Sequence, residues 1–424
     1  MDARSLPVSR WRPRPQRSRG STMHRLAAWL VVLSFPMSAA AQDWHLARRD
    51  GGVDIAKLQP AARRAQRIAL PESAAGTMPA DAVRIDLFGR SLRAERTRFE
   101  TRASGWLWVG RVDDSPGHFV QLTFHAGALA GLLSTAEGNY ELIAQPDGDS
   151  VLAELDGTAF APCGGAIEVL PVASPSEPAM AGRGLPDEPV DVMIAYTPPV
   201  LAALGSVAAV EAHAQAAVDA SNTAFVNSAM TVRFRLVAVM PVARSDSGSI
   251  GADLTWLSGD PDVSARRDAV GADLVSLLVE NGAGACGVGY VMRSPGPGFA
   301  DSAFQVTART CAVGNLSYAH EHGHNMGMEH DPANGTSPAS ASFPWSFGHV
   351  VDGSYRTVMS YSSVCTAGCP RRAYFSNPDV SYLGVPTGVA EERDNHRTGD
   401  LVHPIVAAFR MPPPDAIFAS GFEP

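Results

Sequence analysis

The sequence predicts an α/β fold for its C-terminal half and a smaller, β-rich unit before it. Downstream of residue 190, short apolar runs alternate with a stretch of helical periodicity, which favours an α/β sheet with right-handed crossovers. Upstream, short alternating runs separated by turn residues favour a small antiparallel unit. The expected elements are a β unit at 82–160, strands at 190–196, 232–236 and 274–279, and helices at 208–229 and 393–410.

Each element depends on a simple periodicity. In the helix at 208–229, apolar residues recur at helical spacing. The strand at 232–236 alternates apolar residues with arginine, whereas 274–279 is an apolar run with one serine, as expected of a buried strand. The last helix is expected despite Pro404. The β unit shows its alternation most clearly in Val83, Ile85 and Leu87.

Composition and length limit the class of protein. The chain has 424 residues, of which 45% are hydrophobic and 18% charged, enough for about two to three globular domains. Its net charge of -9 argues against a nucleic-acid partner. Residues 171–189 carry five prolines among serine, glycine and alanine, a composition typical of an exposed linker. Arg183 lies in this linker, where we expect it to be open to a protease.

The N-terminus differs from the rest, because residues 1–41 hold seven arginines and one acid. Arg25 precedes a short apolar run, and small residues up to Ala41 follow, as in a secretory signal cleaved after that residue. Met1 and Met23 are alternative starts, and a membrane anchor is the alternative interpretation. No later segment approaches 18 uninterrupted apolar residues, so we expect a secreted protein, extracellular or periplasmic, whose mature form spans no membrane.

Secretion permits disulfide bonds among the five cysteines. Cys365 and Cys369 lie four residues apart and are expected to close locally. Cys286 and Cys311 would then pair with each other. Cys163 is left over.

A cluster of histidines between residues 320 and 330 carries the chemistry. On a helix, His320 and His324 share one face, because residues four apart are neighbours there. Gly327 lets the chain leave the helix sharply, so that His330 can return as a third ligand. Three protein ligands and an open position are typical of catalytic zinc. Glu321, beside the first ligand, can reach a water in that position.

These residues match the long H-E-x-x-H-x-x-G-x-x-H signature, and here the sequence resembles the metzincin zinc peptidases. A stretch similar to the family's methionine turn follows at 357–361, with Met359 as the methionine. Asp331, directly after the third histidine, is similar to the reprolysin (adamalysin) branch. The stretch 374–388 resembles the bacterial reprolysin-like enzymes grouped with peptidyl-Asp metalloendopeptidase. One departure is Tyr361, which is similar to astacins and serralysins instead.

The resemblance implies a metzincin catalytic domain with a mixed, mostly parallel twisted sheet and an active-site helix. It also implies one catalytic zinc ion, Glu321 as general base, and Tyr361 as a donor to the oxyanion, with a purely structural hydroxyl as the alternative. No motif supports structural calcium, although the sequence does not exclude it. The expected parts are a signal at 1–41, a β-rich propeptide at 42–170, the linker at 171–189, the catalytic domain at 190–411 and a tail at 412–424.

The propeptide is expected to act as an intramolecular inhibitor of a zymogen. Cys163, in Ala161-Pro-Cys-Gly-Gly165, resembles the reprolysin latency switch, because a thiolate is a strong zinc ligand. The alternative is an unpaired structural thiol. The expected substrates are proteins or peptides. Arg371 or Arg372 is expected to select an acidic residue after the scissile bond, and the alternative is a solvated arginine pair.

Two other functions fit the same motif. A secreted binding protein on an inactive metallopeptidase scaffold would have no need of Glu321, which argues against it. A zinc hydrolase of a non-peptide substrate is the third hypothesis.

Overall fold

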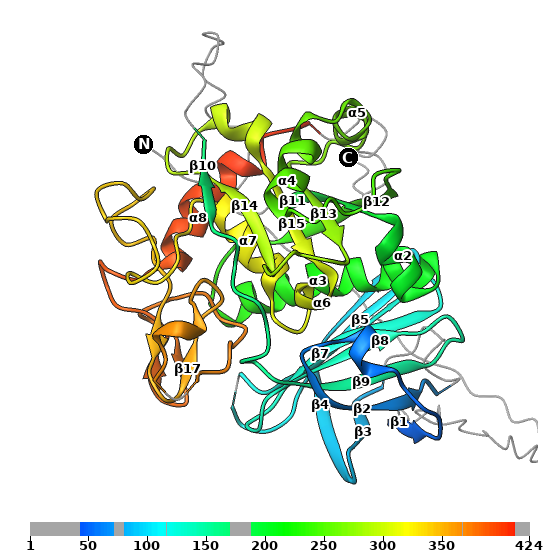
Figure 1. Cartoon of the computed structure of the whole chain (residues 1–424). Coiled ribbons are helices and arrows are strands. Elements are labelled where there is room, and N and C mark those ends of the chain that lie inside the picture. The colour runs from blue at the N-terminus through cyan, green and yellow to red at the C-terminus, as the bar shows by residue number, and fades with distance from the viewer. Residues whose placement is uncertain (1–42, 72–79, 116, 170–187, 367, 412–424) are drawn as a thin grey trace, which may run out of the picture. The chain divides into compact units, whose positions relative to one another are not determined.

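The computed structural model describes residues 43–71, 80–115, 117–169, 188–366 and 368–411, all within one unit that begins at Ala41. The predicted signal, Arg183, most of the linker and the tail lie outside the described residues. The strands and helices are arranged as a β-barrel followed by an α/β part (Figure 1). Among the described residues, no single helix is long and apolar enough to cross a membrane. Only α2 (Pro198–Leu204) and α3 (Val207–Asn227) taken together pass that test, and they are bent by 100°.

Nine strands close the barrel in the order β1-β2-β9-β8-β7-β6-β5-β4-β3. An odd number of strands in a ring cannot alternate throughout, so one neighbouring pair must be parallel, and that pair is β1 with β3. The sequence predicted an antiparallel unit but not its closure. The strands are β1 (Trp44–Arg49), β2 (Ala62–Ala69), β3 (Ala82–Leu87), β4 (Arg90–Arg102), β5 (Gly105–Arg111), β6 (Phe119–His125), β7 (Ala128–Ser134), β8 (Asn139–Ala144) and β9 (Ser150–Leu155), with α1 (Ile55–Leu58) between the first two.

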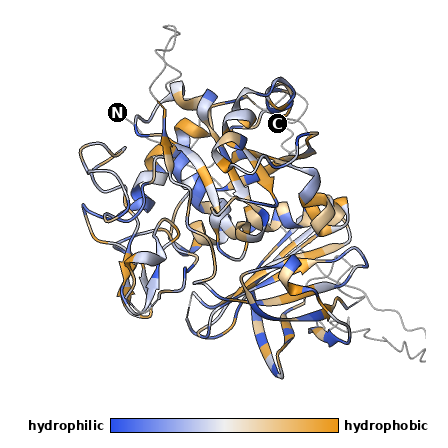
Figure 2. Ribbon diagram, viewed as in Figure 1, coloured by the Kyte–Doolittle hydropathy of each residue, from blue (hydrophilic) through white to orange (hydrophobic). Residues whose placement is uncertain are grey.

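Alternation along the strands fills the barrel, as the striped colouring of the strands shows in Figure 2. Val83, Ile85 and Leu87 of β3 are all buried and belong to the core that also holds Trp106 and Trp108. The alternation noted in the sequence therefore places these three residues on the inward face of β3. Closure abolishes free sheet edges, which removes a route to aggregation.

The second part is built on a six-stranded sheet, ordered β10-β14-β15-β13-β11-β12. Four of its five pairings are parallel and only β14 with β15 is antiparallel, so the predicted α/β class is confirmed. Helices cover both faces, which explains why every residue of β13 is buried. The strands are β10 (Ala166–Glu168), β11 (Val190–Tyr196), β12 (Phe234–Pro241), β13 (Leu274–Val279), β14 (Gly287–Val291) and β15 (Phe304–Ala308).

The helices differ from the predictions mainly at their ends. The long helix α3 starts one residue earlier than expected, since Ser206 caps it by accepting a hydrogen bond from the backbone N–H of Ala209. The last helix, α8, is shorter than expected and tolerates Pro404 near its end. The helices are α2 (Pro198–Leu204), α3 (Val207–Asn227), α4 (Ile250–Gly259), α5 (Pro261–Val270), α6 (Arg309–Ala312), α7 (Ser317–Asn325) and α8 (Asn395–Val406), with 3₁₀ turns at Pro297–Ser302 and Ser362–Val364. Two small hairpins complete the fold, β16 (Val350–Val351) with β17 (Tyr355–Arg356) and β18 (Ser381–Tyr382) with β19 (Val385–Pro386).

The barrel packs on α3 through an interface that contains both an apolar core and buried polar contacts. Leu132 and Ile143 of the barrel share one buried core with the alanines of α3. Arg102 of β4 donates two hydrogen bonds to the carboxylate of Asp219, which is 0% exposed. Glu141 of β8 is equally buried and faces His213 of α3 across 3.8 Å. The barrel is therefore packed against the α/β part through α3 and not merely linked to it by the chain.

Candidate metal centre and active site

Helix α7 carries the first two predicted ligands, and the turn after it returns the third. Gly327 has φ +78, a conformation that favours glycine, and the chain reverses there. The Nε2 atom of His330 lies 3.1 Å from that of His320 and 3.0 Å from that of His324. All three side chains are buried. The structure therefore brings the three predicted histidines to one point.

The hydrogen bonds of these histidines leave their Nε2 atoms without protons. Each Nδ1 faces a backbone carbonyl, which can only accept, so Nδ1 must carry the proton. These carbonyls belong to Val358 at 2.8 Å, Met328 at 2.8 Å and Asn334 at 3.4 Å. Burial lowers the pKa of His324 to about 4 and of His330 to about 3, so both rings are neutral. The lone pairs of the three Nε2 atoms then point at one another at contact distance and repel unless a cation lies among them. A zinc ion fits this set of donors.

Glu321 lies beside this point, in a space left by a glycine. Its carboxyl is fully buried, and burial raises its pKa to about 8. Oε1 has no hydrogen-bond partner among the described residues, and Oε2 accepts from the thiol of Cys163 at 3.6 Å. A Cβ added at Gly287 of β14 would lie 2.6 Å from this carboxylate. Gly287 was not singled out from the sequence, although a glycine inside a strand is a sign of such a close approach.

The segment after the barrel passes directly over the histidines. The Sγ of Cys163 and the three histidine ligand nitrogens all lie within 4.8 Å of one another. The backbone is fixed to the sheet edge, since Pro162 accepts from the N–H of Cys286 at 2.8 Å and the N–H of Gly164 donates to Gly287 at 2.6 Å. β10 continues this path as a parallel partner of β14, beside α7 (Figure 1).

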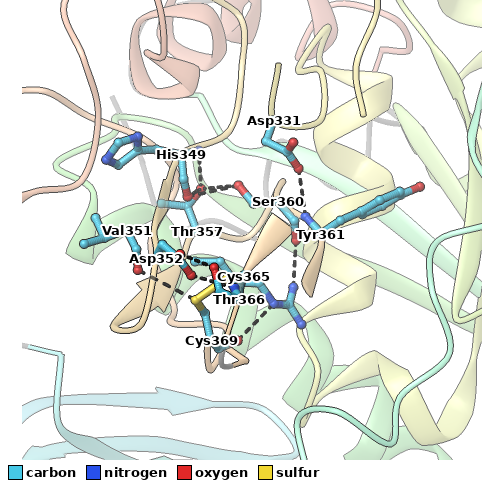
Figure 3. The surroundings of a disulfide bond; sticks show 11 residues. Asp331, His349, Val351, Asp352, Thr357, Ser360, Tyr361, Cys365, Thr366 and Cys369 are labelled. Carbon is cyan, nitrogen blue, oxygen red and sulfur yellow. Dashed lines mark hydrogen bonds between the residues drawn. A yellow bond between two sulfur atoms is a disulfide. The ribbon is translucent and has the colours of Figure 1, made fainter. Parts of the chain in front are cut away.

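The predicted methionine turn lies beneath α7. Met359 is fully buried, and a Cβ added at Gly323 would meet its sulfur at 2.5 Å, so that glycine lets the two approach. Asp331 accepts the N–H of Tyr361 at 3.0 Å, which ties the turn to the residue after the third histidine (Figure 3). The hydroxyl of Tyr361 donates to the carbonyl of Cys163 at 3.3 Å. The turn thus contacts both the ligand helix and the covering segment.

The two candidate specificity arginines have different surroundings. Both are buried, at 6% and 4% exposure, so they are not a solvated surface pair. Arg371 lines a cavity of about 60 Å³ together with Cys163, Glu321 and Tyr361. Arg372 points to the barrel, where it donates to the hydroxyl of Ser134 at 3.1 Å and does not line that cavity. Of the two alternatives that the sequence left open, Arg371 therefore reaches the cavity, whereas Arg372 is held by a partner 238 residues away in the sequence.

Both predicted disulfides are present. Cys286–Cys311 lies under the covering segment, and Cys365–Cys369 closes the loop after the methionine turn (Figure 3). Cys163 is the free thiol of the described chain. Sequence reasoning missed Arg356, which lines the same cavity as Arg371 and belongs to no motif.

A neutral three-histidine set with an unpaired buried carboxyl beside it defines a metal-dependent hydrolase, and zinc suits that set. A family model described as metallo-peptidase family M12B, reprolysin-like, matches residues 187–392. A peptidyl-Asp metalloendopeptidase of Stenotrophomonas maltophilia (strain R551-3) is 30% identical over 358 residues, covering 77% of this chain and 82% of the relative. The chain belongs to the reprolysin-like M12B metallopeptidases and is a zinc metalloendopeptidase.

Two further comparisons differ in how much of each chain they cover and in sequence identity. A peptidyl-Asp metalloendopeptidase of Xanthomonas campestris pv. campestris is 34% identical over 201 residues, or 46% of each chain. The solved structure of metalloproteinase-II from Bacteroides fragilis covers 62% of this chain and 85% of its own at 10% identity, with a TM-score of 0.36. That likeness is too remote to support an argument.

Proposed function

We propose that the chain is exported as a latent precursor and matures into a zinc endopeptidase in which Glu321 is the general base. The observation that carries the catalytic part is the convergence of three unprotonated Nε2 atoms beside a carboxyl oxygen with no other partner. His320, His324 and His330 would hold the ion. Zinc, when bound, acidifies the attacking water and polarises the scissile carbonyl.

Glu321 would accept the proton of the attacking water and pass it to the leaving amine. Burial raises its pKa to about 8, and the positive charge of a bound ion would favour the ionised form that a general base requires. Tyr361 would donate to the developing oxyanion once its hydroxyl is released from the carbonyl of Cys163.

Latency is the role we propose for residues 42–169. The thiol of Cys163 lies within ligand distance of the histidine cluster, and the segment that carries it is hydrogen-bonded along the edge of the sheet. An extended substrate needs the same edge, because strand addition satisfies its backbone. The segment therefore competes with substrate for both the metal and the strand.

Export is supported by the two disulfides, since such bonds persist in oxidising compartments. We infer protein or peptide substrates, with an acidic residue after the scissile bond. The name of the Stenotrophomonas relative and the buried position of Arg371 support that preference.

The proposed function is tested with casein and precursor that has been cleaved in the linker. Cleaved enzyme should digest casein, lose this activity with 1,10-phenanthroline and recover it when zinc is added back. Intact precursor serves as the control and should be nearly inactive. Digestion that persists in the chelator would refute the zinc mechanism.

A further inference from the structure

Two buried arginines lie side by side next to the histidine cluster. Arg356 is 3% and Arg371 is 6% exposed. Both donate to the same carbonyl oxygen, that of Ser360, at 2.7 Å from Nη1 of Arg356 and 3.2 Å from Nη2 of Arg371. Two positive groups that share one acceptor repel each other, so this arrangement is costly without a nearby anion.

No acidic side chain of the described chain pairs with either guanidinium. Their other acceptors are main-chain carbonyls: Cys369 for Arg356, at 3.2 Å, and Asn315 for Arg371, at 2.8 Å. The carboxylate of Asp331 is already used by the N–H of Tyr361 and by Asn334. Main-chain carbonyls position the two cations but do not neutralise them.

Donors remain free on both side chains. Nε of Arg371 is buried without a partner, and Nη2 of Arg356 makes no hydrogen bond to the described residues. Both side chains line the cavity of about 60 Å³ that also reaches His320 and Glu321. Residues 160–163 form one wall of that cavity in the precursor, so it widens when they leave.

We infer that Arg356 and Arg371 together bind the side-chain carboxylate of the substrate residue that follows the scissile bond. This inference rests on the proposed endopeptidase function and assigns its specificity to a pair of residues. A carboxylate accepts from both guanidinium groups and offsets their mutual repulsion with its negative charge, whereas an amide of the same shape carries no charge to do so. The pair therefore discriminates Asp from Asn, which differ little in size.

The test compares two peptides that differ only in Asp or Asn after the scissile bond. The readout is the ratio of their kcat/KM values in one enzyme preparation, which does not depend on the fraction of enzyme that is folded. In the wild-type enzyme, kcat/KM for the Asp peptide should exceed that for the Asn peptide about tenfold to a hundredfold. Arg356→Gln and Arg371→Gln should each lower that ratio about tenfold or more. Arg372→Gln is the matched control, and its ratio should stay at the wild-type value.

Three results would separate the possible failures. A wild-type enzyme that cleaves both peptides equally, or Gln variants with the wild-type ratio, would overturn the pocket while leaving the peptidase function intact. A wild-type enzyme without chelator-sensitive cleavage would instead reject the proposed function, and the pocket with it. If a Gln variant is inactive on both peptides, the lysine variant at that position decides, and a lowered ratio supports the pocket whereas an unchanged ratio refutes it.

Discussion

Replacing Arg102 by alanine should destabilise the precursor by about 3 kcal/mol, because it leaves the carboxylate of Asp219 buried without its counter-ion. Arg102 spans the two oxygens at 2.8 and 2.7 Å, and Asp219 is 0% exposed. Removing one partner of a buried pair costs about 3–5 kcal/mol. The low end applies here, since Thr123 and Gln215 still donate to Asp219, at 2.8 and 3.1 Å.

Urea unfolding of the precursor, followed by tryptophan fluorescence, measures this loss, because Trp106 and Trp108 lie in the barrel core. The matched control is Arg93→Ala, whose ion pair with Glu95 is about half exposed on the barrel surface; it should cost less than about 1 kcal/mol. Adding Asp219→Asn to the Arg102 variant should restore part of the loss. Equal effects of the two arginine variants would refute the reasoning.

Three further predictions concern titration, latency and a disulfide. Burial raises the pKa of Glu141 from 4.5 to about 7, so the stability present below pH 4.5 is lost as pH rises through 7. The free energy of unfolding of Glu141→Gln should therefore exceed that of wild type by about 3 kcal/mol at pH 8 and equal it at pH 4. A pH-independent difference would contradict this. Cys163→Ala precursor should cleave casein before linker cleavage, whereas an equally latent variant would reject the thiol as the inhibitor. Serine at both Cys286 and Cys311, which are 25 residues apart, should cost about 3.5 kcal/mol in urea unfolding, and a loss below about 1 kcal/mol would be inconsistent with a closed bridge.

Local patterns made the active site predictable from sequence. His320 and His324 are one helical turn apart, and Gly327 follows within three residues, so their juxtaposition needs only helix geometry and one turn. The parallel strands of the second part were also predictable, since burial on both faces leaves a largely apolar run such as β13, in which Ser276 is the one polar residue.

Non-local pairing explains what the sequence did not reveal. Closure of the barrel depends on β1 meeting β3 and on β2 meeting β9, and alternation specifies the face of a strand but not its neighbour. Gln121 and Thr123 are polar but buried, because α3 covers them. Arg356 and Arg372 belong to no motif, and only the tertiary fold brings one to the cavity and the other to the barrel.

The most direct test of the mechanism is the zinc content and turnover of cleaved Glu321→Gln enzyme, measured on one preparation. The account predicts one zinc per chain, as in wild type, because Glu321 is not among the three histidine ligands, and a turnover lower by about a hundredfold to ten-thousandfold. His324→Ala, which removes a ligand, should lose the metal as well. Near-normal turnover of zinc-loaded Glu321→Gln enzyme would contradict the role of this carboxyl as the general base.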